Sequence, residues 1–283
     1  MNFANLKEWT TPRGKVTELA IDGVTVWKNA KTLGELAVGS SVFMNVNRAR
    51  TEFLVVQQGN PDSAMYDNSC DGTWLLMKNI FAEKAFDSTN NDYENSDIHE
   101  YLNDDFVYQL DSNIRSTIKQ VKIPYYRGTG NAGSVAQGSN GLSAKIFYLS
   151  TREVGFNLAN APVDGVCLSY FVGADATKRV AYYNNTTTKW ALRSPRTGVA
   201  NRSWIVDKTG VSSDSAYYNS TYGIRPALIL PSETLVDENF KVSIRAGYAS
   251  FTISAESAED YPELPDVGDG RSVYIPQGEI RTD

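Results

Sequence analysis

Short apolar runs separated by turn residues dominate the first third of the chain and predict β-strands. Residues 15–29, KVTELAIDGVTVWKN, hold two such runs around Asp22-Gly23, a dipeptide typical of a two-residue hairpin turn. Residues 41–46, 51–59 and 72–79 read as three further strands, which we expect to pair as neighbours. The pattern therefore predicts a small β-hairpin over residues 1–30, followed by a larger domain that begins with strands.

The apolar spacing becomes helical at residues 96–110. A helix there would carry one apolar face, made of Ile98, Tyr101, Leu102, Phe106 and Leu110. Asp97 and Glu100 have the spacing of a capping box at its start. A second helix is predicted from about Asp111 to the residues before Pro124, with a stripe of Ile114, Ile118 and Val121.

The second half of the chain returns to strand-like runs joined by polar loops. Residues 127–143 are rich in Gly, Ser and Asn and predict a surface loop. Residues 145–151, 202–210 and 225–231 predict strands. Strands, two helices and then mostly strands give an α+β fold class, with domains at 1–30, 31–238 and 239–283, the last an acidic extension.

Composition narrows the function classes. The chain has 283 residues and a net charge of −6, and its Lys and Arg residues are scattered. Without a basic cluster to neutralise several phosphates, nucleic acid is not an expected partner. No apolar run has membrane-spanning length and the N-terminus lacks a signal peptide's apolar core, so we expect a protein made in the cytoplasm, without membrane insertion.

Motifs that suggest catalysis lack the context that their chemistry needs. Gly128, Gly130 and Gly133 spell GxGxxG, but no helix begins there to hold a pyrophosphate. Ser116-x-x-Lys119 and Lys208-Thr209-Gly210 match motifs of penicillin-binding enzymes. Helical geometry turns Ser116 and Lys119 away from the apolar stripe, toward water, where a lysine keeps its proton.

Metal and nucleophile chemistry is also poorly supported. Cys70, Cys167 and the single histidine, His99, lie far apart in the sequence, too few for a zinc site and without a partner base or nucleophile. The sequence leaves open whether the two cysteines form a disulfide. We expect no cofactor, no metal and no catalytic residue.

Two stretches rich in Tyr, Asn and Ser each precede an apolar run. They cover residues 181–189 and 212–222, and the chain between them includes Trp204. Tyr gives large contact area at low entropic cost, and Asn and Ser adapt their hydrogen bonds, which is the composition of binding loops on rigid scaffolds. The alternative is that these stretches are ordinary turns of a β-rich protein.

Three segments carry a resemblance: WALRSP at 190–195, SWIVDKTG at 203–210 and YGIRPALIL at 222–230. Together they resemble the C-terminal half of C-type-lectin-fold proteins, in particular the variable proteins of diversity-generating retroelements. They also resemble a related uncharacterised family of phage and bacterial genomes, whose first half resembles residues 96–106, 121–126 and 145–156. The resemblance covers roughly residues 33–238 and implies a C-type-lectin-like fold.

In those variable proteins a fixed frame carries an exposed, diversified binding face. The resemblance places in the frame Trp190, Leu192, Arg193, Ser194, Pro195, Gly223, Arg225, Pro226, Ala227 and Leu228. It places in the ligand-binding face Arg196, Asn201, Arg202, Trp204, Asp207, Ser213, Asp214, Tyr217, Tyr218 and Asn219. Tyr182, Tyr183, Asn184 and Asn185 precede the frame and are assigned to the face less securely.

The resemblance implies a non-catalytic protein that binds an unknown protein or glycan, such as a bacterial cell-surface receptor, from a phage tail. It also admits a homo-oligomer. The triplets of calcium-dependent sugar-binding lectins are missing. Two alternatives stay open. One is a structural virion or scaffold protein whose loops make subunit contacts. The other is an enzyme, either a cell-wall hydrolase or one related to formylglycine-generating enzymes, although both cysteines precede the LRSP segment.

Overall fold

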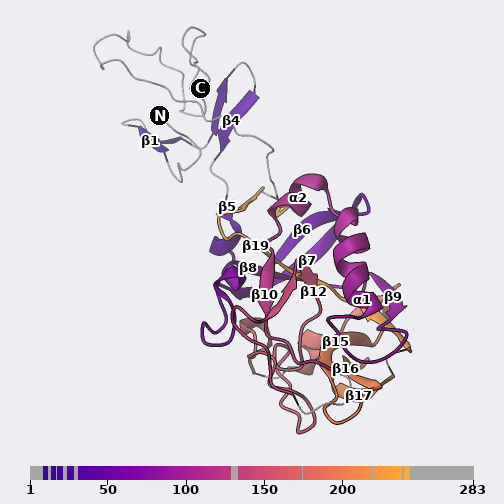
Figure 1. Ribbon diagram of the computed structural model, residues 1–283. Coiled ribbons are helices and arrows are strands. Elements are labelled where there is room, and N and C mark those ends of the chain that lie inside the picture. The colour runs from indigo at the N-terminus through magenta and orange to yellow at the C-terminus, as the bar shows by residue number, and fades with distance from the viewer. Residues whose placement is uncertain are drawn as a thin grey trace, which may run out of the picture. The chain divides into compact units, whose positions relative to one another are not determined.

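The chain divides into two compact units, which are described separately. One comprises Thr32–Ile244, and the other Met1–Lys31 with Arg245–Asp283. The computed structural model (Figure 1) describes the strands within residues 9–28 and residues 31–128, 133–173, 175–217, 219–237 and 239–242. The acidic extension predicted at 239–283 thus lies almost wholly outside the described residues.

The N-terminal segment pairs as two short antiparallel ladders. β1 (Trp9–Thr11) pairs with β2 (Gly14–Val16), and β3 (Glu18–Ile21) pairs with β4 (Val24–Lys28). Ile21 lies opposite Val24, so the antiparallel pairing predicted around Asp22-Gly23 is confirmed.

The larger unit contains a five-stranded sheet in the order β12-β19-β8-β7-β6, all of whose neighbours are antiparallel. Its strands are β6 (Ser41–Val46), β7 (Ala49–Gln58), β8 (Thr73–Met77), β12 (Ile146–Phe147) and β19 (Ala227–Leu230). The three predicted strands that begin this unit do pair as neighbours. Every residue of β8 and β19 is buried, as a run of bulky apolar residues in a central strand requires.

A second five-stranded sheet has the order β17-β16-β15-β18-β9. Its strands are β9 (Ala82–Ala85), β15 (Trp190–Pro195), β16 (Arg202–Val206), β17 (Ser212–Tyr217) and β18 (Thr221–Ile224). β15 and β18 run parallel and the other neighbours antiparallel. In Figure 1, β15, β16 and β17 lie at the end of this unit that is farther from α2.

The helical segment of 96–110 is more varied than its apolar spacing suggests. α1 (Asp97–Glu100) continues into the π-helical η4 (Tyr101–Asp105) and the 3-10 helix η5 (Phe106–Gln109). The apolar face is confirmed, because Ile98, Leu102, Phe106 and Leu110 are buried. The predicted Asp97/Glu100 capping box is wrong: the N-cap is Ser96, whose Oγ accepts a hydrogen bond from His99 N at 3.2 Å.

The second helix is shorter than predicted. α2 covers Ser112–Thr117, with Ile118 as its C-cap. Val121 does not belong to a helical stripe, because it begins strand β10 (Val121–Ile123), which pairs with β11 (Leu142–Ala144). Val121 is nevertheless buried, since an apolar residue can serve the core equally well from a strand.

Smaller elements complete the unit. They are β5 (Lys31–Thr32), η2 (Leu33–Glu35), η3 (Asn68–Cys70), η6 (Ser169–Phe171), η7 (Ala176–Arg179), β13 (Tyr182–Tyr183), β14 (Thr186–Thr187) and β20 (Leu235–Val236). The unit is sheet-rich with short helices, so the predicted α+β class holds. Among the residues that the structure describes, no helix is long and apolar enough to cross a membrane.

The core of this unit is centred on Trp74. Its ring meets Tyr66 and Phe147 edge to face, each with ring centroids 5.6 Å apart. Trp74 Nε1 donates to the carbonyl of Cys70 at 3.0 Å, so the buried indole leaves no donor unsatisfied. The hydroxyl of Tyr66 donates to the buried Glu153 carboxylate at 2.8 Å, so this apolar core adjoins a buried polar network.

Candidate functional site

Arg193 of β15 lies at the centre of a fully buried polar network. Its guanidinium makes two hydrogen bonds to the Glu153 carboxylate, at 2.5 and 2.7 Å, and neither side chain is exposed. It also donates to the carbonyls of Tyr148 and Asp164, each at 2.9 Å, and of Pro124 at 3.2 Å. Tyr66 donates its hydroxyl to Glu153 at 2.8 Å. Because the pair is bidentate and its remaining groups are bonded, its attraction offsets the cost of burying two charges.

The pairing of β15 with β16 contains a bulge or a similar irregularity. The register with β16 shifts between Ala191 and Pro195, and all six residues of the strand are buried. A bulge breaks the usual alternation of faces and re-aims side chains. Arg193 and its neighbour Ser194 therefore both reach the interior.

Ser194 joins the network to a second acid, Asp164. Its Oγ lies 2.9 and 2.8 Å from the two Asp164 carboxylate oxygens and accepts a hydrogen bond from Thr151 N at 2.9 Å. Burial raises the pKa of Asp164 to about 6, although Arg193 and the Ser194 hydroxyl act to lower it. Gly165 follows with a φ of 153°, and a Cβ there would come within 2.7 Å of the Tyr66 hydroxyl oxygen. The network is therefore close-packed.

Two further frame residues, Trp190 and Arg225, form a second buried cluster. Trp190 Nε1 donates to the carbonyl of Arg179 at 2.8 Å, and the guanidinium of Arg225 lies over the indole, 4.8 Å from its centroid. Arg225 Nε donates to the carbonyl of Met77 at 2.9 Å, which ties this stack to the first sheet. Burial lowers the pKa of Arg225 to about 10.

Gly223 and Pro226 fit tightly beside this stack. Gly223 pairs with Trp190 across the parallel strands, and a Cβ on it would come within 2.6 Å of the Ile80 side chain. The carbonyl of Pro226 accepts from Met77 N at 2.9 Å. The buried frame residues are thus Trp190, Leu192, Arg193, Ser194, Pro195, Gly223, Arg225, Pro226, Ala227 and Leu228.

Several residues predicted for the ligand-binding face lie at the surface between frame segments. Asn201 and Asn219 are exposed, while Arg196, Arg202 and Ser213 are half-buried and have bonding partners. Asp214 and Tyr217 belong to β17, but their side chains, like residue Tyr218 as a whole, lie outside the described part. Arg202 and Tyr217 are register partners across β16 and β17. The stretch from Ser212 is thus an edge strand at its start, not a loop.

Two residues predicted for the ligand-binding face, Trp204 and Asp207, have side chains that bond to other groups of the fold. The expectation that Trp204 is exposed is wrong: it is 7% exposed, and its Nε1 donates to the carbonyl of Asn160 at 3.3 Å. Asp207 is half-buried, and its carboxylate accepts from Thr209 N, Thr209 Oγ1 and Val211 N at 2.8 to 3.0 Å. Burial acts to raise its pKa, but these hydrogen bonds outweigh burial and lower it. Its carboxylate thus closes the turn between β16 and β17.

Asn91 forms hydrogen bonds to the backbone of the loop of residues 196–202. The buried Asn91 donates its side-chain Nδ2 to the carbonyls of Val199 and Arg202, at 2.8 and 2.6 Å. Its backbone N donates to the carbonyl of Ala200 at 3.0 Å. The exposed Asn201 therefore projects from a loop whose backbone is fixed by an interior side chain. Nothing in the sequence near Asn91 indicates this role.

The earlier Tyr/Asn stretch is a tight hairpin. β13 and β14 pair with Tyr183 opposite Thr186. The two residues between them, Asn184 and Asn185, have φ angles of 48° and 62°, the conformation of a type I′ turn, which Asn tolerates well. The requirements of an ordinary turn therefore explain the two asparagines without a binding role. The neighbouring Tyr182 is 46% exposed.

The structure also places most of the residues that the sequence offered for catalysis. Cys70 and Cys167 are free thiols. Burial raises the pKa of both, that of Cys70 to about 12, which keeps them protonated and weakly nucleophilic. Ser116 is exposed, as predicted, and its Oγ donates to Asn113 O at 2.8 Å. The helical argument for Lys119 is wrong, because α2 ends at Thr117; Lys119 is half-buried and its Nζ donates to Asp71 O. Burial lowers the pKa of His99. Of the GxGxxG motif, Gly130 lies outside the described residues.

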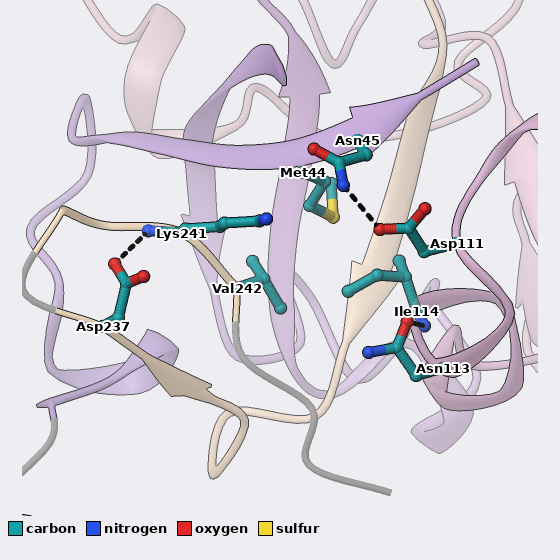
Figure 2. A pocket seen from close by; sticks show the side chains of 8 residues that line it. All are labelled: Met44, Asn45, Asp111, Asn113, Ile114, Asp237, Lys241 and Val242. Carbon is teal, nitrogen blue, oxygen red and sulfur yellow. Dashed lines mark hydrogen bonds between the residues drawn. The ribbon is translucent and has the colours of Figure 1, made fainter. Parts of the chain in front are cut away.

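One cavity lies beside β6 and the start of α2 (Figure 2). It has a volume of about 260 Å³. Figure 2 shows Asn45 facing Asp111, to which its Nδ2 donates at 2.8 Å, and Lys241 N donating to Asp237 at 2.9 Å. Several polar groups that line this cavity are thus already hydrogen-bonded to one another. A second cavity, of about 480 Å³, lies between the helical segment of 96–117 and β11.

The comparisons with known proteins give the family. Residues 71–232 match the model of the family described as a domain of unknown function (DUF6273). This match covers more than half of the 283 residues, so the chain belongs to that family. A search of curated proteins returned no match, and neither did a search of solved structures.

Proposed function

We propose that this protein is a non-catalytic binding protein that recognises its ligand with the surface between β15 and β18. Among the described side chains this display surface consists of Arg196, Asn201, Arg202, Ser213 and Asn219, and we expect from the sequence that Asp214, Tyr217 and Tyr218 belong to it as well. The ligand would be a protein or glycan of a bacterial cell surface, bound by a phage tail component.

The observation that carries the proposal is the separation of buried frame from exposed insertions. The LRSP and GIRPAL segments contribute only buried side chains, and the guanidiniums of Arg193 and Arg225 bond to interior acceptors. Asn201 and Asn219, between these segments, are exposed. A frame of this kind would let the intervening residues change without loss of the fold.

The finer fold assignment is also a proposal: a C-type-lectin-like fold built from the two five-stranded sheets. It is supported by the position of the WALRSP and GIRPAL segments. They form β15 and the β18–β19 region, where the chain passes from one sheet to the other. A buried frame at this passage would hold the two sheets together beneath the display surface.

The chemistry of the display surface suits adaptable recognition. Arginine offers a planar fork of donors, and Asn presents both a donor and an acceptor. Tyrosine adds a flat ring with few torsions to restrict. Together these groups can bind sugars or peptides without a metal ion.

One observation favours a second candidate, a structural virion protein that makes subunit contacts. β17 is an edge strand, and edge strands offer backbone groups to another chain. In that case Tyr217 and its neighbours would face another copy of the chain. Sedimentation of the purified protein over a range of concentrations separates the two candidates: the binding reading allows a monomer, whereas subunit contacts require association.

The binding proposal is tested by measuring attachment of the fluorescently labelled protein to a panel of bacterial strains. We expect attachment to some strains, and at least a tenfold loss in a variant with Asn201→Ala, Arg202→Ala and Asn219→Ala. The matched control carries Glu83→Ala and Lys84→Ala in β9, the opposite edge strand of the same sheet. Equal attachment of both variants would contradict the assigned surface.

A further inference from the structure

The cavity between the helical segment and β11 shares no residue with the display surface. Its volume of about 480 Å³ lies within the range of sites for small molecules. Its walls come from α1, η4, η5, α2 and the strand region of residues 143–145. These elements belong to the same compact unit, so the cavity is formed within one unit.

Two cations line this cavity without an acidic partner. Arg115 and Lys145 are half-buried, and in the part of the chain that the structure describes neither forms an ion pair. Their charges stand out in a chain whose net charge is −6. Asp104 and His99 also line the cavity, but Asp104 is exposed and burial keeps His99 mostly neutral by lowering its pKa. The lining therefore favours an anion near Arg115 and Lys145.

Neutral hydrogen-bonding groups surround the cations. Ser112, Ser116 and Ser143 contribute hydroxyls, and Gln120 donates its Nε2 to Ser143 Oγ at 2.9 Å. The Gln120 Oε1 and the Ser112 hydroxyl have no partner among the described residues. Groups of this kind both donate and accept, which suits a ligand that carries several hydroxyls.

An exposed aromatic ring completes the cavity. Tyr108 is 66% exposed, so much of its ring is accessible to a ligand at this cavity. The guanidinium of Arg115 lies 4.6 Å from its centroid. Arg115 lies over one face of the ring, and the exposed remainder of the ring offers apolar surface beside that positive charge, which suits the apolar face and the charged substituent of an acidic sugar.

The wall between helix and strand is held by Asn103. Its Nδ2 donates to the carbonyls of His99 and Ile146, each at 3.0 Å, and its Oδ1 accepts from Lys145 N at 2.9 Å and Ile146 N at 3.2 Å. The Asn103 amide thus donates two hydrogen bonds and accepts two, and the bonds with Lys145 and Ile146 link these residues to the helical segment. The backbone that carries Lys145 is therefore preorganised, which lowers the entropic cost of binding.

We propose that this cavity binds a carboxylated sugar, such as a uronic acid unit of an acidic polysaccharide. Arg115 and Lys145 hold the carboxylate, Tyr108 contacts the apolar face of the sugar ring, and Ser112, Ser143 and Gln120 bond its hydroxyls. The site stands apart from the display surface, so it does not depend on the function proposed above.

Titration calorimetry at low salt tests this site with D-glucuronate, glucose, acetate and inorganic phosphate as separate probes. We expect glucuronate to bind at least tenfold more tightly than glucose, acetate or phosphate, because only it offers both charge and hydroxyls. Arg115→Met should weaken glucuronate binding at least tenfold, and Tyr108→Ala several-fold. Lys78→Met, which removes a positive charge outside the cavity, should leave it unchanged.

Three outcomes would overturn the proposal. They are no glucuronate binding by the wild-type protein, equal binding of acetate or phosphate, and equal binding by wild type and Arg115→Met. If Arg115→Met does not fold, judged by its circular dichroism spectrum, Arg115→Lys replaces it. That variant keeps the charge but loses the planar fork, so it should bind glucuronate more weakly than the wild type. Unchanged binding by Arg115→Lys would equally count against the site.

Discussion

The Arg193 guanidinium and the Glu153 carboxylate form a bidentate ion pair, at 2.5 and 2.7 Å, with no exposed surface on either side chain. This pair joins β15 to the turn that follows β12, and through Tyr66 it reaches the apolar core. Arg193 belongs to the strand that leads directly into the loop of residues 196–202, which carries Asn201. The stability of the surface is therefore expected to depend on this pair.

Breaking the pair should be costly. Arg193→Met leaves the Glu153 carboxylate buried without its charge partner, and we expect it to lower the free energy of unfolding by about 3–5 kcal/mol. The control is Lys78→Met, which breaks a partly exposed pair with Glu52 and should cost less than about 1 kcal/mol. Urea denaturation followed by circular dichroism measures both. Equal losses would mean that the buried pair contributes no more than a surface pair.

Asp164 should make stability depend on pH. Its pKa is about 6 in the folded protein against an ordinary 3.8, so between these values the folded state holds a proton that the unfolded chain has released. The contribution of Asp164 to the free energy of unfolding therefore falls as pH rises from 4 to 6, by up to about 3 kcal/mol, and is flat above. Asp164→Asn removes this dependence. Urea denaturation at several pH values measures the free energy of unfolding of both proteins. We expect the wild-type free energy minus that of the variant to fall between pH 4 and 6. A difference that rises, or does not change, would contradict the assignment.

Two glycines contrast a tightly packed turn with an exposed loop. Gly210 and Gly198 have φ angles of 83° and 81°, so an alanine at either pays the same left-handed cost of about 1–2 kcal/mol. A Cβ on Gly210 would also overlap the carbonyl of Ala176, whereas a Cβ on Gly198 meets nothing within 4 Å. Gly210→Ala should therefore melt well below Gly198→Ala in thermal denaturation, by a further destabilisation of about 1–3 kcal/mol. Coincident melting temperatures would show that the turn at Gly210 is not tightly packed.

Trp204 should behave as a core residue. Trp204→Ala removes a buried ring and should cost about 3–5 kcal/mol. Asn201→Ala, on the exposed loop before it, should change stability by less than about 0.5 kcal/mol. Urea denaturation of the two variants measures the contrast. If Trp204→Ala changed the free energy of unfolding only slightly, Trp204 would not be a core residue and could belong to the display surface.

The sequence predicted the apolar framework of the larger unit well. Strands at 41–46 and 72–79 and the buried face of Ile98, Leu102 and Phe106 all follow from period and β-propensity, which are local properties. The same pattern could not reveal that residues 96–109 change from α to π to 3-10 spacing. Apolar periodicity reports which face is buried, and it is insensitive to which carbonyl each N–H bonds.

The candidate site was only partly predictable, because its contacts join distant segments. Glu153 precedes Arg193 by 40 residues, and Asn91 precedes Arg202 by 111, so no local pattern pairs them. Trp204 was misassigned because the resemblance places residues between the frame segments on the binding face, although it lies on a strand with four buried residues. Asn184 and Asn185 could have been assigned from turn chemistry alone, since two adjacent asparagines suit a type I′ turn.

The central claim, a fixed frame with a variable surface, is tested most directly by sequencing the gene across many natural isolates. The segment encoding residues 181–222 is compared with the segment encoding residues 96–121. We predict substitutions concentrated at Asn201, Tyr217, Tyr218 and Asn219, with Trp190, Arg193, Trp204 and residues 223–228 constant. Equally low variation in the two segments would contradict a diversified binding face and would favour a fixed structural surface.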